Sequence, residues 1–352
     1  MQLNRISGFI FFILSLNFSA VSQTLNLKVN KVLTIGGPEI EKEGYLFIAP
    51  QEAFTDSSGN IYVRDVVTTM GFHSQSIKKF DANGKYLLTI GKKGRGPGEF
   101  LRILSFCINQ NNEILTYDEI NRRYSIFSTG GKLLRNFRAT KRGYFSLHAL
   151  RTFSTNKFLI AHEQIPEYKI NNVFTVFKSD MKKILFSFGT KKDFQNNTDP
   201  LFEEIFYYEK IPFALLDTTK LLGSHIYYNG CATFMENKDG KWISKEIKAH
   251  RCRYTNVDRI PEKYVKSGNY SAYKNPGGLI ISSGYNGKVY GYLIRNFTAG
   301  IFPFQKDKFI QFILILIKKG EYEFGFNLFS DSGEFLGYQK IKNYTDIFNI
   351  SF

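Results

Sequence analysis

Short segments with alternating apolar and polar positions run through the chain and are separated by turn residues. Residues 60–64, Asn-Ile-Tyr-Val-Arg, alternate with a period of two, which is typical of a half-buried strand. Residues 77–81 and 86–90 continue the series, and the pair Asn83-Gly84 stands between them. Because both residues tolerate a positive φ, the pair predicts a type I′ hairpin turn. The pattern therefore predicts an antiparallel strand-turn-strand unit.

This unit recurs along the chain. Such repetition of small sheets predicts an all-β fold, a six-bladed β-propeller of four-stranded antiparallel blades. We expect one propeller domain over residues 23–352. Residues 31–36 resemble residues 86–91, the outer strand of the first copy, and we expect them to supply the outer strand of the last blade and so close the ring. The copies cover approximately residues 50–91, 106–132, 147–188, 212–247, 278–295 (the weakest) and 301–341.

The first residues have the pattern of a secretory signal. Arg5 gives a positive start, residues 6–20 are mainly apolar, and Ala20 and Ser22 are small residues at the positions that a leader peptidase reads. The sequence predicts cleavage after residue 22 and a periplasmic or secreted protein without a stable membrane anchor. A retained anchor is the alternative. A lipoprotein is not expected, because the first cysteine is Cys107.

Residues 309–317 form the other strongly apolar segment. It is too short to cross a bilayer as a helix, since a spanning helix needs about 20 residues. We expect a buried strand there.

The charge of the chain is strongly basic, with 47 Lys and Arg against 31 Asp and Glu and a formal net charge of +16. The cations come in scattered pairs such as Lys182-Lys183 and do not form one dense stripe. Such a distribution favours a solvated surface, and nucleic-acid binding agrees poorly with export.

Three cysteines, Cys107, Cys231 and Cys252, cannot all pair within one molecule. A hairpin that turns near residues 237–240 would not set Cys231 opposite Cys252, so we expect three unpaired cysteines. A Cys231–Cys252 disulfide remains the alternative.

One linker and one repeat carry a resemblance to a known family. Residues 91–100 read Gly-Lys-Lys-Gly-Arg-Gly-Pro-Gly-Glu-Phe, and the second copy places Asp118 before Asn121-Arg122 and Phe127. At these residues the chain resembles the NHL and TolB-like six-bladed β-propellers, and in particular an exported bacterial group with this linker. The resemblance implies the propeller fold. Many members of the wider group have no assigned activity, while some relatives are lyases and others are metal-dependent lactonases.

Four polar residues stand at the ends of second strands, where they would converge on one face of a propeller. Carboxylates and imidazoles from separate blades can hold a divalent metal such as Ca²⁺ or Zn²⁺, or act as an acid/base pair. The alternative is that the aspartates bond one blade to the next and the histidines end their strands. The candidates are Asp65, Asp118, His162 and His225.

The linker adds Arg95 and Glu99 as candidate ligand-binding residues on the same face. A glycine-rich loop with a cation can hold an anion. It lacks the Gly-Lys-Ser/Thr ending of a nucleotide loop, so its glycines are better explained by a sharp turn of the chain between blades.

The sequence contains no recognisable catalytic motif, and we assign no catalytic residue. We therefore expect a non-enzymatic binding module for a peptide, glycan or partner protein on the open face. The alternative is a metal-dependent lyase or hydrolase that uses the Asp/His ring.

Overall fold

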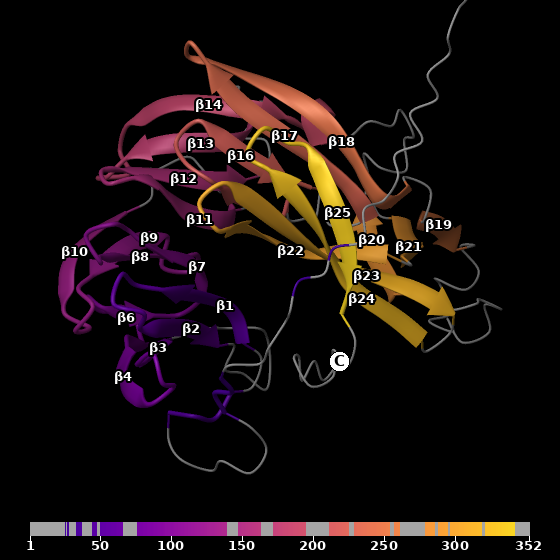
Figure 1. Cartoon of the computed structure of the whole chain (residues 1–352). Helices are drawn as coiled ribbons and strands as arrows, with labels where there is room; N and C mark the ends of the chain where they lie inside the picture. The colour runs from indigo at the N-terminus through magenta and orange to yellow at the C-terminus, as the bar shows by residue number, and fades with distance from the viewer. Residues whose placement is uncertain are drawn as a thin grey trace, which may run out of the picture.

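The computed structural model describes residues 25, 27, 33–36, 44–47, 50–65, 76–138, 147–162, 172–194, 211–224, 229–253, 257–260, 279–285, 288–294, 296–318 and 321–341. The fold is an all-β propeller with four-stranded antiparallel blades, as predicted (Figure 1). Five sheets have four strands, and residues 257–294 contribute a sheet of three. Within the described part of the chain, no helix is both long and apolar enough to span a bilayer.

The blades follow one another along the chain, and each four-stranded blade begins with its innermost strand (Figure 1). The first blade contains β1 (Pro50–Thr55), β2 (Ile61–Asp65), β3 (Ile77–Phe80) and β4 (Tyr86–Ile90). A short parallel pair, β5 (Lys92–Lys93) and β6 (Glu99–Phe100), links it to the second blade, which contains β7 (Ile103–Ile108), β8 (Ile114–Asp118), β9 (Arg123–Phe127) and β10 (Leu133–Arg138).

The third and fourth blades have the same order. The third contains β11 (Leu147–Ser154), β12 (Lys157–His162), β13 (Asn172–Lys178) and β14 (Ile184–Thr190), followed by the short helix α1 (Lys191–Phe194). The fourth contains β15 (Phe213–Leu215), β16 (Lys220–Gly223), β17 (Asn229–Lys238) and β18 (Lys241–Arg253).

The fifth and sixth copies differ from one another. The fifth, predicted as the weakest, is the three-stranded sheet of β19 (Val257–Ile260), β21 (Lys288–Ile294) and β20 (Leu279–Tyr285). The sixth is a complete blade, called here the last blade, with β22 (Asn296–Phe304), β23 (Lys308–Lys318), β24 (Glu321–Ser330) and β25 (Phe335–Lys340). The apolar segment 309–317 lies in β23, where Phe309 and Ile313 are fully buried, so the predicted buried strand is confirmed.

Apolar clusters join neighbouring blades. Phe106 and Phe127 of the second blade pack with Tyr62 of the first, and similar clusters join the second to the third and the third to the fourth. The fourth blade packs directly against the last one, where Phe234 lies 6.3 Å from Phe309, ring centroid to ring centroid.

The turn at Asn83-Gly84 is not the predicted type I′. In the structure only Gly84 has a positive φ, of 80°, and its amide donates to Asp81 O at 3.0 Å. Asp81 Oδ1 accepts from the amides of Asn83 and Lys85, both at 2.9 Å, which favours a right-handed conformation at Asn83. The second blade repeats this geometry with Ser128 and Gly131.

The N-terminal segment contacts both the first and the last blade. The amide of Leu25 donates to Tyr338 O in β25 at 3.2 Å, and Leu27 exchanges two hydrogen bonds with the side chain of Gln339. Residues 33–36, the described part of the predicted closing strand, form no strand. Leu33 instead lies against Gly84 of the first blade, where an added Cβ would come within 2.9 Å of Leu33 Cδ1. Closure of the ring by residues 31–36 is not shown.

The prediction of three unpaired cysteines is wrong for Cys231, which forms a disulfide, whereas Cys107 is a free, buried thiol. The prediction assumed an uninterrupted hairpin. The register of β17 and β18 instead shifts beyond Cys231, because Cys231 pairs with Lys248 whereas Asn229 pairs with Arg253. Cys252, the remaining cysteine of the sequence, lies on β18 within this irregular stretch.

Candidate functional site

Asp118 holds the linker between the first two blades. Its fully buried carboxylate ends β8 and accepts hydrogen bonds from the amides of Leu101 at 2.9 Å and Arg102 at 3.2 Å. Asn121 donates to it twice, from its amide at 3.1 Å and its side chain at 2.7 Å. Four donors therefore surround this carboxylate, an arrangement that favours a role as a structural acceptor.

Asp65 is 3% exposed at the end of β2, and its Oδ2 lies 4.0 Å from Lys78 Nζ. The same ammonium donates to Leu46 O and lies over the ring of Phe47, 4.6 Å from its centroid. Burial lowers the pKa of Lys78, although the charge of Asp65 acts in the opposite direction. Residues of the N-terminal segment thus cover the ammonium that pairs with Asp65.

His162 ends β12 and is only 2% exposed. Its Nε2 lies 2.7 Å from Thr175 Oγ1, which in turn lies 2.9 Å from Ser187 Oγ. These contacts stay within the third blade and link three of its strands. His225, the fourth candidate, lies outside the described residues.

The linker residues pack on each other. Glu99 Oε2 accepts from the Gly96 amide at 2.8 Å, and Glu99 Oε1 pairs with Lys92 Nζ at 3.4 Å. The hydrogen bond from Gly96 is the main reason why the pKa of Glu99 is lowered. A Cβ on Gly94 would come within 2.0 Å of Glu99 Oε2, so this glycine is needed for the close approach. Arg95 is exposed, and its carbonyl accepts from Arg123 at 3.2 Å.

The structure therefore brings Arg95, Glu99 and Asp118 to one linker, while Asp65 ends β2 of the first blade and His162 ends β12 of the third. Among the residues that the structure describes, no three His, Cys, Asp or Glu side chains are grouped so that they could hold a metal ion. The assignment of the six candidates to ligand binding stays a prediction.

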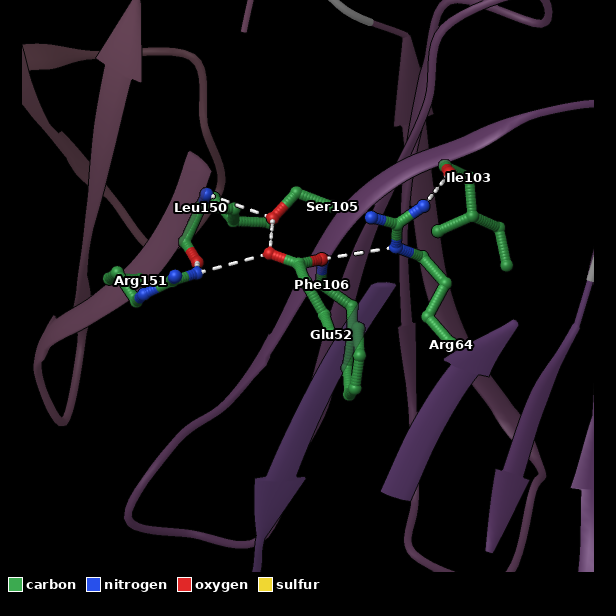
Figure 2. Close-up of polar contacts among 7 residues, drawn as sticks. All are labelled: Glu52, Arg64, Ile103, Ser105, Phe106, Leu150 and Arg151. Atoms are coloured by element: carbon green, nitrogen blue, oxygen red, sulfur yellow. Dashed lines mark hydrogen bonds and ion pairs between the residues drawn. The ribbon is translucent and has the colours of Figure 1, made fainter. Parts of the chain in front are cut away.

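A second set of polar residues lies on β1, β2, β7 and β11, and the sequence analysis did not identify it (Figure 2). Glu52 of β1 accepts from Ser105 Oγ at 2.8 Å and the Phe106 amide at 3.3 Å, both on β7. It also pairs with Arg64 Nε at 3.1 Å and with Arg151 Nη1 of β11 at 3.3 Å. One carboxylate thus joins the innermost strands of three blades.

Arg151 extends this network to the fourth blade. Its guanidinium carbon lies 4.9 Å from the ring centroid of Phe54 in β1 and 5.6 Å from that of Phe213 in β15. Cations over aromatic faces are stabilised by the ring quadrupole. The network of Glu52, Arg64, Ser105 and Arg151, called here the Glu52 network, therefore connects four consecutive blades around the centre of the propeller.

A cavity of about 300 Å³ lies where the first turns of the four blades meet. These turns follow the innermost strands, so they lie at the end of the blades opposite to Asp65 and Asp118, which end second strands. The candidate site predicted from the sequence lies at the end where the second strands finish, not at this cavity. The sequence does contain a signal for the cavity, since polar turns recur at residues 56–60, 109–113 and 217–219. The lining consists of Thr55, Asp56, Ser57, Ile108, Asn109, Gln110, Asn112, Thr152, Phe153, Leu215, Leu216 and Asp217.

Blades of four antiparallel strands, joined through clusters between successive blades, define the protein as a β-propeller. Residues 54–211, which include most of the first three blades, match the model of a protein family described as a 6-bladed beta-propeller. The recognition of a six-bladed β-propeller family in the sequence is thereby confirmed. The finer resemblance to NHL and TolB-like propellers stays a prediction.

Two of the solved structures to which the chain is similar come from Bacteroides. A member of the DUF4221 family from Bacteroides vulgatus is 13% identical, with a TM-score of 0.50, over 85% of this chain and 83% of that chain. A putative exported protein from Bacteroides fragilis is 15% identical, with a TM-score of 0.48, over 94% of this chain and 79% of that chain. No curated protein matches the sequence. At these identities the similarity concerns the fold alone.

Proposed function

We propose that the protein is an exported, non-enzymatic β-propeller that binds a peptide, a glycan or a partner protein at the cavity between the first turns. The observation that carries this proposal is the cavity itself, because residues from four blades line one hollow of about 300 Å³. Small-molecule sites in proteins typically occupy roughly 300–1,000 Å³. Export rests on the signal pattern of residues 1–22.

The chemistry of the lining favours binding over catalysis. It contains no histidine, cysteine or lysine. Its one buried carboxylate, Asp56, already accepts from the amides of Ser58 and Asn60, from Asn60 Nδ2 and from the hydroxyl of Tyr62. A carboxylate with four donors is poorly suited to act as a general base or a metal ligand.

A binding screen with two variants tests the proposal. The mature protein is offered panels of peptides, glycans and envelope proteins, and hydrolysis or elimination of each ligand is followed in parallel. Thr55→Trp fills the cavity from an exposed position, while Arg95→Ala changes an exposed residue of the linker. We expect Thr55→Trp to abolish binding and Arg95→Ala to leave it unchanged.

Two results would contradict the proposal. Binding that survives Thr55→Trp but is lost in Arg95→Ala would move the site to the linker. Turnover of a ligand together with stoichiometric calcium or zinc, both lost on His162→Ala plus His225→Ala, would establish the metal-dependent lyase or hydrolase instead.

A further inference from the structure

The first turns differ in charge from the rest of the surface. The four turns at the cavity, residues 55–60, 109–113, 155–156 and 217–219, contain no lysine or arginine, although the chain has 47 of them. The turns between the third and fourth strands of the same blades do contain lysine, for example Lys85 and Lys132. Both sets of turns lie at the same end of the blades, because the strands are antiparallel. The turns at the cavity mouth are therefore neutral to acidic themselves, although Lys157 and Lys220 directly follow two of them, and we expect these turns to bind an anion poorly.

The walls of the cavity are held by bonds between blades. Ser57 of the first blade donates from its amide and its hydroxyl to Asn112 Oδ1 of the second, at 3.2 and 3.1 Å. Thr155 of the third blade donates to Gln110 Oε1 of the second at 2.7 Å. Polar groups fixed in this way lose little conformational freedom when a ligand binds.

Three of the residues that line the cavity are exposed and keep polar groups with unused bonding capacity. Gln110 uses its oxygen for Thr155, and its amide nitrogen donates to no group among the described residues. Asp217 uses Oδ1 to accept from the Thr219 amide at 2.6 Å and the Thr219 hydroxyl at 2.7 Å, while Oδ2 accepts from no described residue. The Thr55 hydroxyl can both donate and accept.

These groups stand beside apolar side chains, namely Ile108, Phe153 and Leu216. The matching ligand must offer donors to a carboxylate, acceptors to an amide and apolar C–H surface, and must carry no negative charge. Adjacent hydroxyl groups on a sugar ring meet all of these conditions, since each hydroxyl both donates and accepts. We propose that the cavity binds a neutral saccharide, with Gln110 donating to a sugar oxygen and Asp217 accepting from a sugar hydroxyl. This inference rests on the binding function proposed above.

The decisive variants replace a hydrogen-bond donor by an acceptor, or an acceptor by a donor, with almost no change in the shape of the side chain. Gln110→Glu keeps the oxygen that accepts from Thr155 but replaces the donating nitrogen by an acceptor. Asp217→Asn keeps the oxygen that accepts from Thr219 and replaces Oδ2 by a donor. Asp81→Asn is the matched control, because Asp81, like Asp217, accepts two hydrogen bonds within its own turn but lies outside the cavity lining.

The measurement is calorimetric titration of the mature protein with neutral, uronic-acid and sulfated oligosaccharides, after thermal melting has shown that each variant folds. We expect binding of a neutral oligosaccharide, weakened about tenfold or more by each of the two exchanges. Asp81→Asn should bind as the wild type does.

The other outcomes separate this inference from the function on which it rests. A preference for uronic-acid or sulfated ligands, or neutral-saccharide binding that neither exchange weakens, overturns the inference. Peptide binding that Gln110→Glu and Asp217→Asn abolish overturns it as well but retains the binding function. Failure to bind any saccharide, peptide or envelope protein overturns both.

Discussion

Replacement of Glu52 by glutamine perturbs the Glu52 network at its centre. The carboxylate accepts from Ser105, from the Phe106 amide, from Arg64 and from Arg151, so it bonds to β2, β7 and β11 as well as lying on β1 (Figure 2). Glutamine has nearly the same size as glutamate but carries no charge. Its amide nitrogen is itself a donor, so it cannot accept the hydrogen bonds that the replaced carboxylate oxygen accepts. The variant therefore leaves two guanidinium groups without their anion and creates almost no change in volume.

The size of the effect follows from burial. Arg64 and Glu52 have side chains only 7% and 14% exposed, so water cannot replace the lost partner at Arg64. Breaking a buried ion pair by removing one partner costs about 3–5 kcal/mol. Arg151 is 30% exposed and is partly solvated, so it adds less. We expect Glu52→Gln to lower the free energy of unfolding by about 3 kcal/mol.

Urea unfolding followed by intrinsic fluorescence measures this loss. Glu236→Gln is the control, since Glu236 pairs at 2.9 Å with Lys238, whose side chain is 61% exposed, and such a surface pair contributes about 0–1 kcal/mol. A double-mutant cycle with Arg151→Gln should give a coupling free energy of about 0.5–3 kcal/mol. If Glu52→Gln unfolds at the same urea concentration as Glu236→Gln, the Glu52 network does not hold the blades together and the reasoning is refuted.

Three further predictions concern single side chains. Asp118→Ala should lower the free energy of unfolding by about 3 kcal/mol, because four donors lose the buried carboxylate that accepts from them, and it should leave the metal content unchanged. Calorimetry and elemental analysis check both expectations, and loss of a bound metal would contradict the structural role. Burial raises the pKa of Cys107 to about 12, so iodoacetamide at pH 8 should label Cys107 only after unfolding. Cys231 should be labelled only after a reductant has cleaved its disulfide. Peptide mass spectrometry shows which thiols react. Burial raises the pKa of Asp56, but its hydrogen bonds, led by that from Asn60, lower it more. The stabilisation from Asp56 is therefore complete above its unfolded pKa and is lost as the pH falls through its lower folded pKa. In acid unfolding below about pH 4, Asp56→Asn should therefore lose less stability than the wild type. If the free energy of unfolding falls equally steeply with pH in both proteins, this prediction is contradicted.

The sequence was sufficient to predict the strands and their turns because these features are local. The alternation at residues 60–64 and the glycine at residue 84 are each read within a few residues, and both lie where the strand and the turn were expected. The turn type was wrong, because the side chain of Asp81 binds the turn amides and removes the need for a positive φ at Asn83.

The central network and the cavity could not be predicted in the same way. Glu52 and Arg151 are 99 residues apart, and nothing near either residue indicates the other. Asp56 and Asn109 resemble ordinary turn residues, and each does form its turn. Their common position around one cavity depends on how the blades are arranged, which local patterns do not contain.

Repetition gave the positions of Asp118 and His162 correctly but not their surroundings. Both end second strands, as expected, yet each is buried among partners of its own blade or of the adjoining linker. A polar residue at a strand end can bind a ligand or stabilise the fold, and only its contacts distinguish the two roles. The same limit applies to Cys231, whose disulfide depends on a register shift that the hairpin pattern does not reveal.

A crystal structure of the mature protein in complex with its tightest neutral oligosaccharide tests the central claim most directly. We predict that a sugar ring lies in the cavity between the first turns, within hydrogen-bond distance of Gln110 Nε2 and Asp217 Oδ2. A sugar bound instead at the linker end of the blades, beside Arg95 and Asp118, with the cavity unchanged, would contradict the account.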